Sequence, residues 1–190
     1  MTLPTTSFLD SPNALDSGDI LVVGLQKTDN GAMAHAPGLD SDTQEALTLL
    51  AAAIDADGSL DSAWRQGPPP SLHVRSVVFT GLGDEAITAD RLRESAGYAA
   101  LQISKGERVV FALAESGDEL AAVVEGALLG SHRVQKPGKS ADEARPTLAF
   151  LGSLDDASLS RAMVSTEAVW RVRDLVTMPP NLLNPVSFVD

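Results

Sequence analysis

The chain has 190 residues, and its 14 Lys and Arg against 26 Asp and Glu give a formal net charge of −12 at pH 7. No basic cluster offsets this charge, so a nucleic-acid partner, which is bound by displacing counterions from phosphates, is not expected. There is no cysteine, which excludes disulfides, thiolate metal sites and cysteine nucleophiles. The N-terminus lacks a signal-peptide pattern and no apolar run of about 18 residues follows, so we expect a cytoplasmic protein without a membrane partner.

Short apolar runs alternate with amphipathic segments along the chain, which is the pattern of strands followed by helices. Strands are predicted over residues 20–25, 74–80, 108–114 and 147–152, with a short additional strand near residues 7–9. Helices are predicted over residues 41–56, 88–104, 118–131 and 157–178, and residues 136–143 form an exposed excursion. This alternation predicts an α/β fold with a largely parallel sheet and helices on both faces, because parallel neighbours need crossover connections.

The three histidines are far apart in the sequence and have no carboxylate at metal-ligand spacing, so a metal site is not expected. His35 is predicted in a loop and His73 at the start of a strand. His132 is predicted at the C-terminus of a helix, where a protonated imidazole suits the helix dipole. We therefore interpret each histidine as structural.

Gly81-Leu82-Gly83 follows a predicted strand and precedes a helix, where α/β proteins often hold phosphate against backbone N–H groups. The third glycine of a dinucleotide-binding motif is absent, and Asp84 and Glu85 place negative charge at the same point. This pattern favours a plain tight turn, with a nucleotide site as the minor hypothesis.

Many carboxylates lie near the ends of predicted elements, which is typical of helix caps and solvated faces. These residues are Asp16, Asp19, Asp55, Asp57, Asp118, Glu119, Asp142, Glu143, Asp155 and Asp156. The adjacent pair Asp155 and Asp156 lacks the spaced oxygen ligands of a calcium loop. The sequence also contains no general acid–base pair, nucleophile elbow or Walker loop. No active site is recognised from these patterns.

Two segments have an order of residues that is more informative about the family than the patterns above. Residues 173–185 read Arg-Asp-Leu-Val-Thr-Met-Pro-Pro-Asn-Leu-Leu-Asn-Pro, and the segment resembles one in the leucyl aminopeptidase (cytosol aminopeptidase) family, with Thr177-Met178 in place of Asn-Thr and Asn184 in place of Thr. Residues 125–133 read Glu-Gly-Ala-Leu-Leu-Gly-Ser-His-Arg and resemble a second segment of that family, with His132 in place of Tyr. The resemblance spans roughly residues 18–190.

The resemblance implies a three-layer, macro-domain-like α/β sandwich with a mixed, mostly parallel sheet over residues 1–156. Residues 157–178 would form a linker helix, and residues 179–190 would begin a truncated catalytic domain, because Pro179-Pro180 ends one helix and Asn184-Pro185 starts another.

The resemblance also implies that the full-length protein is a homohexameric aminopeptidase that acts on peptides with two divalent ions, Mn or Zn. In the family a lysine and several carboxylates downstream of residue 190 hold these ions. No catalytic, cofactor-binding or metal-binding residue is therefore assigned in this chain, Glu167 and Asp190 included. We expect a non-catalytic domain that serves assembly and active-site access and is inactive by itself.

Two other hypotheses stay open. One is a free-standing macro-like module that binds ADP-ribose or a related nucleotide at the carboxyl ends of the strands. The other is a structural protein that oligomerises through its long helix, with Met163, Val169, Trp170 and Val172 as the apolar surface. In the aminopeptidase interpretation, the same four side chains pack on the absent domain.

Overall fold

The computed structural model describes residues 3–104, 106–133 and 146–177, which form one mixed α/β unit. The strands are β1 (Thr5–Leu9), β2 (Ile20–Thr28), β3 (Gly31–His35), β4 (Ala63–Gln66), β5 (Ser76–Gly83), β6 (Arg108–Phe111) and β7 (Thr147–Leu151). The helices are α1 (Ser41–Ala53), α2 (Ala89–Ala100), α3 (Gly117–Gly130) and α4 (Asp156–Thr177), with a short 3-10 helix, η1 (Pro12–Ala14).

The strands form one sheet in the order β1-β7-β6-β2-β5-β4. The first five strands of this order are parallel to one another, and β4 runs antiparallel to β5. The long strand β2 shares one of its edges between two partners, because its first residues pair with β6 and its last residues pair with antiparallel β3. The predicted mostly parallel sheet is confirmed.

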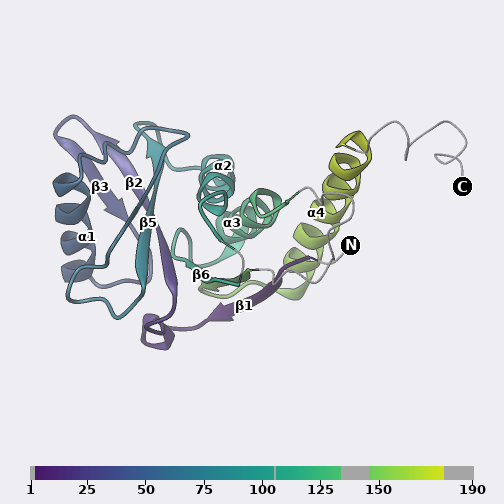
Figure 1. Ribbon diagram of the computed structural model, residues 1–190, viewed down its shortest axis with the longest axis horizontal. Coiled ribbons are helices and arrows are strands. Elements are labelled where there is room, and N and C mark those ends of the chain that lie inside the picture. The colour runs from purple at the N-terminus through teal and green to yellow at the C-terminus, as the bar shows by residue number, and fades with distance from the viewer. Residues whose placement is uncertain (1–2, 105, 134–145, 178–190) are drawn as a thin grey trace, which may run out of the picture.

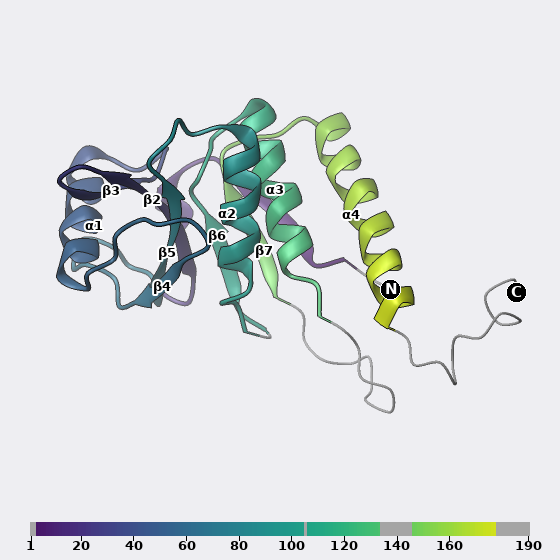
Figure 2. The same cartoon turned by 90° about the horizontal axis from the view of Figure 1, so that it is seen from above.

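Helices cover both faces of the sheet (Figure 1). Alternate residues of the buried strand β2 point to opposite sides, as the period of two requires. Leu21 and Val23 pack in the core under α1, whereas Ile20 and Val22 pack in the core under α2 and α3. Helix α4 lies beyond α3, at the end of the molecule away from α1 (Figure 2). The predicted layers of helix, sheet and helix are therefore present.

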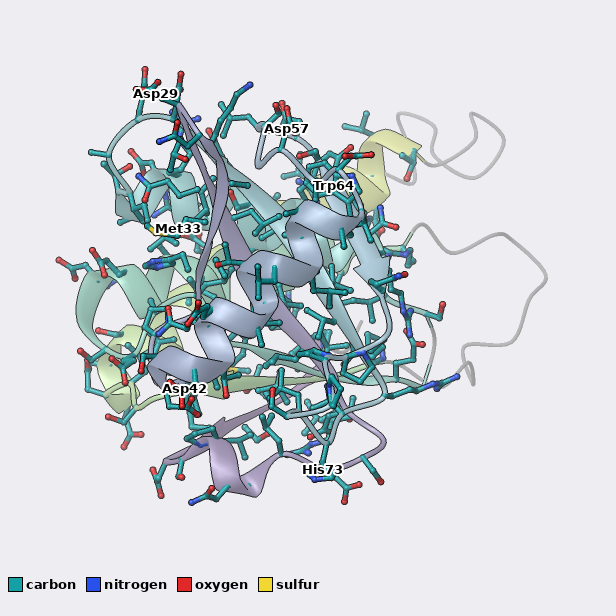
Figure 3. All side chains as sticks on the ribbon, turned by 90° about the vertical axis from the view of Figure 1, so that its left-hand side faces the viewer. Asp29, Met33, Asp42, Asp57, Trp64 and His73 are labelled. Carbon is teal, nitrogen blue, oxygen red and sulfur yellow. The ribbon has the colours of Figure 1, made fainter. Side chains whose placement is uncertain are left out.

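Strands β3 and β4 were not expected from the sequence. A two-residue turn at Asp29 and Asn30 folds β3 back on β2, and Asp29 lies at the tip of this hairpin (Figure 3). The expectation that His35 lies in a loop is wrong, because His35 is the last residue of β3 and pairs with Gly24. In the sequence Gly-Ala-Met-Ala-His, three of the five residues are Gly or Ala, which have low strand propensity, so its pairing with β2 makes it a strand.

Several carboxylates cap helices, as expected. Asp40 accepts a hydrogen bond from the N–H of Thr43 at 2.8 Å at the start of α1, which crosses the near face of the sheet in Figure 3. Asp155 accepts one from the N–H of Ser158 at 2.9 Å at the start of α4, and this bond lowers the pKa of Asp155.

Asp19 is an exception to the interpretation as a cap or solvated carboxylate. It is only 2% exposed and accepts hydrogen bonds from Arg108 at 2.8 and 2.6 Å. The two residues are 89 positions apart, so the sheet brings them together where β2 and β6 begin.

Residues 136–143 and 179–190, for which predictions were made, lie outside the described residues.

Candidate functional site at the junction of three helices

Residues 125–133 and the described beginning of the other segment, residues 173–177, meet in space, where α2, α3 and α4 pack together. Residues 125–133 form the second half of α3 and the turn that follows it, and Arg173 and Asp174 lie in the last turns of α4. Figure 2 shows α3 between α2 and α4. This three-helix junction is the candidate site, because both specific segments contribute to it.

Glycines bring the backbones of α2 and α3 into direct contact. A Cβ on Gly126 would overlap the carbonyl oxygen of Arg93, and a Cβ on Gly130 would overlap that of Gly97. A Cβ on Gly97 would lie 3.3 Å from the carbonyl oxygen of Gly126. Only glycine permits so close an approach of two backbones. The glycine pattern in residues 125–133 is therefore explained by helix packing.

Glu125 connects all three helices. Its Oε2 accepts a hydrogen bond from Nε of Arg93 on α2 at 2.7 Å, and its Oε1 accepts one from Oγ of Ser165 on α4 at 2.8 Å. Arg93 also pairs with Asp90 one turn earlier on α2. The hydrogen bonds that Arg93 donates to Asp90 and Glu125 raise the pKa of the guanidinium group. Both carboxylate oxygens of Glu125 are occupied, so the network is structural.

His132 joins the end of α3 to α4. Its Nε2 lies 2.8 Å from Oδ1 of Asp174, and its ring contacts the buried Trp170 edge-on with centroids 5.0 Å apart. Nearby, Arg173 donates a hydrogen bond to the carbonyl oxygen of Leu129 at 2.8 Å. The position of His132 after the end of α3 is as predicted. His132, which stands in place of Tyr in one family-like segment, therefore contacts Asp174 of the other.

Arg133 binds the carboxyl ends of two helices. Its guanidinium group donates to the carbonyl oxygens of Gly130 and His132 after α3, and to that of Ala100 at the end of α2. Unpaired carbonyls at helix C-termini carry partial negative charge, which a cation stabilises. This contact fixes the ends of α2 and α3 relative to each other.

A groove of about 280 Å³ lies over α3 between the first turns of α2 and α4. Ala121, Ala122 and Ala162 line part of it, and its charged lining residues are Arg93, Asp118, Glu125 and Arg161. Arg93 and Glu125 are hydrogen-bonded to each other, so these two do not offer a free binding group to a ligand.

The histidines are not brought together. His35 Nε2 lies 3.1 Å from the carbonyl oxygen of Leu113, and burial lowers the pKa of His35. His73 is exposed and lies three residues before β5, at the opposite edge of the α1 face from Asp57 (Figure 3). Within the described ranges, no group of three or more His, Asp or Glu side chains has the geometry to hold a metal ion.

Gly81 and Gly83 do not form the tight turn that we predicted. Both are buried residues at the end of β5, and a Cβ on Gly81 would overlap the carbonyl oxygen of Ser59. The N–H of Gly83 donates to the carbonyl oxygen of Gly58 at 2.9 Å. The glycines thus make room for the segment before β4, and the N–H of Gly83 is already bonded within the protein.

The long helix exposes only part of the predicted apolar surface. Met163 is partly buried against the core and Trp170 is 2% exposed, so neither is available on the outside. Val169 and Val172 are exposed at 36% and 59%. Two of the four side chains are therefore turned inward, because α3 covers one face of α4.

None of the described helices is long and apolar enough to cross a membrane.

Residues 22–137, more than half of the chain, match the N-terminal domain of the cytosol aminopeptidase family. The chain belongs to this family. Relatives called probable cytosol aminopeptidase include one from Nocardia farcinica, 34% identical over 188 residues, and one from Leifsonia xyli, 31% identical over 202 residues. The matches cover 90% and 100% of this chain but only 37% and 38% of those proteins.

Solved structures of other proteins share the fold. A mutant of tomato leucine aminopeptidase superposes with a TM-score of 0.66 and 17% identity, over 97% of this chain and 40% of that one. The bottromycin maturation enzyme BotP superposes with a TM-score of 0.65 and 19% identity, over 91% and 36%. The expected membership of the aminopeptidase family and the expected fold class are therefore confirmed.

Sequence reasoning missed the partners of the junction. Arg93 and Ser165 carry no motif, and only Glu125, inside a family-like segment, gave a signal for this contact. Arg133 was noted only as the end of that segment. The helix spacing of Arg93 and Ser165 places each on a face toward α3, but it does not identify the partner.

Proposed function

We propose that this chain is the N-terminal, non-catalytic domain of a metal-dependent leucyl aminopeptidase, an enzyme that removes N-terminal residues from peptides. The observation that carries the proposal is the match to the family's N-terminal domain by a chain that spans little more than a third of its relatives' length. The proposed division is a domain over residues 1–156, a linker helix over 157–178 and the start of the catalytic domain over 179–190.

The described residues do not fit a two-metal centre, since no suitable cluster of His, Asp or Glu occurs among them. We propose that residues of the complete enzyme outside this chain hold the two divalent ions, Mn or Zn. One similar structure is the enzyme BotP in complex with Mn, which supports a divalent metal in this family. When bound in a complete enzyme, such ions would supply Lewis-acid chemistry for peptide hydrolysis.

The junction of α2, α3 and α4 gives the domain its proposed role. Helix α4 leads toward the proposed catalytic part, and the contacts of Glu125, His132 and Arg173 fix its direction. A rigidly held helix sets the position of whatever follows it. We propose that this positioning serves assembly of a homohexamer in the cytoplasm and controls access of peptides to the active site.

The first test of this proposal uses the purified chain. Leucine p-nitroanilide should not be hydrolysed with Mn²⁺ or Zn²⁺ above a blank that contains the metal alone. Hydrolysis above this blank would show that the chain carries its own active site.

The second test uses a graft. The corresponding N-terminal segment of the Nocardia farcinica relative is replaced by this chain, and the graft should hydrolyse the substrate and assemble as the parent protein does. A graft with Gly130→Leu should lose assembly and activity, while a graft with Gly67→Ala, in open space, should keep both. If the graft is active and assembled with Gly130→Leu as well, the junction has no positioning role.

A further inference from the structure

The groove over the first turns of α2, α3 and α4 contains two charged side chains that the packing of the helices does not use. Its charged lining residues are Arg93, Asp118, Glu125 and Arg161. Arg93 and Glu125 bond to each other, as described above. Asp118 and Arg161 are both exposed, and neither forms an ion pair within the described ranges of the chain. One anion and one cation of the groove are therefore available to a ligand.

These two charges lie at the same end of the groove. Two hydrogen bonds between α3 and α4 join residues that are 40 and 42 positions apart in the sequence. The same offset places Asp118 of α3 level with residues 158–160 of α4, within one turn of Arg161. Packed helices have axes about 8–10 Å apart. A small molecule in the groove can therefore contact both side chains at once.

The signs of the charges select the ligand. The two arginines and two carboxylates of the lining cancel, so the groove as a whole favours neither an anion nor a cation. A simple anion would be repelled by Asp118, and a simple cation would be repelled by Arg161. We propose that this groove binds a free α-amino acid as its zwitterion. The guanidinium group of Arg161 donates to the carboxylate in a bidentate manner, and the carboxylate of Asp118 accepts from the ammonium group.

The rest of the lining selects the side chain of the amino acid. Four alanines contribute to the groove, namely Ala89, Ala121, Ala122 and Ala162. The volume of about 280 Å³ lies just below the range of about 300–1,000 Å³ that is usual for ligand pockets. Small methyl groups and a small volume suit a short aliphatic side chain, such as that of valine. The Arg93–Glu125 pair closes the polar side of the groove to a third charge.

Binding at this place also connects two helices. Asp118 lies in the first turn of α3 and Arg161 in the second turn of α4, so the ligand would join the starts of both helices. Helix α4 ends at Thr177, about 24 Å along its axis from Arg161. In Figure 2 the starts of α3 and α4 lie at the upper ends of these helices. The groove is thus separate from the contacts of His132 and Arg173 near the end of α4. The proposal concerns the chain itself and does not rest on the proposed peptidase function.

Three related compounds test the two contacts on the unmodified chain. L-valine is titrated from zero to about 50 mM at constant ionic strength and pH 7, and amide shifts of the isotope-labelled protein are followed by NMR. The shifts should saturate in the groove, with a Kd of about 1–10 mM, because exposed charges bind weakly. N-acetyl-L-valine lacks the ammonium group and L-valinamide lacks the carboxylate, so each should bind at least fivefold more weakly. Shifts that do not saturate by 50 mM, or equal binding of the three compounds, overturn the proposal.

Substitutions at the two charged residues locate the site. Arg161→Gln and Asp118→Asn should each weaken the binding of L-valine at least fivefold. Arg171→Gln is the matched control for the cation, because Arg171 lies on the same helix outside the groove. Asp42→Asn is the control for the anion, because Asp42 is the second residue of α1 as Asp118 is of α3, and Figure 3 shows it at the start of α1.

Both control variants should bind L-valine as the unmodified chain does, and circular dichroism verifies that each variant is folded. Binding that persists unchanged in Arg161→Gln or in Asp118→Asn overturns the two-point contact. Saturable shifts confined to residues outside the groove contradict the assigned site. The comparison of the three compounds does not depend on the folding of any variant.

Discussion

The backbone of Gly130 on α3 rests directly against the backbone of Gly97 on α2, so closely that a Cβ on Gly130 would overlap the carbonyl oxygen of Gly97. One turn earlier, Gly126 makes the same kind of contact with the carbonyl of Arg93. The two glycines of a family-like segment thus fix the distance between two helices, and the polar contacts of Glu125 and Arg133 depend on that distance.

Gly126→Ala should lower the free energy of unfolding by about 1–3 kcal/mol, the usual cost of forcing extra atoms into a packed contact. Urea unfolding followed by circular dichroism measures the loss. Gly67→Ala is the control, because a Cβ there meets nothing within 4 Å. Equal stability of both variants would mean that α2 and α3 can separate at no cost.

Asp19→Ala should destabilise the protein by about 1–3 kcal/mol, because it removes the buried carboxylate to which the partly exposed Arg108 donates hydrogen bonds. Glu85→Gln removes an exposed ion pair with Arg91 of similar length, 2.8 Å, and should cost about 0–1 kcal/mol. Thermal or chemical unfolding of the two variants under the same conditions compares them. If the two losses are alike, the Asp19–Arg108 pair does not hold β2 to β6.

The stability of the chain should decrease as the pH falls below about 6.5, in part because of His35. Burial lowers the pKa of His35 in the folded state, so the unfolded chain binds the proton first. The contribution of neutral His35 to stability is fully present above the pKa that this histidine has in the unfolded chain. It is lost as the pH falls from that value toward the lower pKa of His35 in the folded protein. Unfolding curves between pH 8 and about 5 should be less pH-dependent in His35→Gln. An unchanged slope in this variant would assign the effect to other groups.

The contact between His132 and Asp174 should appear as a coupling energy of about 1 kcal/mol in a double-mutant cycle of His132→Ala and Asp174→Ala. The variants are made in a Trp64→Phe background, so that Trp170, which touches His132, is the reporting fluorophore. Arg171→Ala with Asp174→Ala is the comparison pair, since Arg171 bonds to Glu167 instead. Additive losses in the first cycle would show that the pair contributes nothing to holding α4.

The order of strands and helices was predictable, because the period with which apolar residues recur along the chain shows which side of each element is buried. Residues 20–25 and 147–152 were recognised as strands from apolar runs alone, and the structure has β2 and β7 there. Strand β3 was not predictable, because a segment rich in Gly and Ala becomes a strand here by pairing with β2. Likewise, Gly81 and Gly83 follow the sequence rule for a turn, yet they lie in a strand that another segment covers.

The sequence by itself determined the class of fold, the charge, and the two segments at residues 125–133 and 173–185 that marked the family. Only the tertiary structure decided that the first of these segments contacts Arg173 and Asp174, that Arg93 and Ser165 share Glu125, and that Asp19 is buried against Arg108. The physical reason is that periodicity records which face of an element is buried. The partner on that face depends on how distant parts of the chain pack, and no local pattern contains that information.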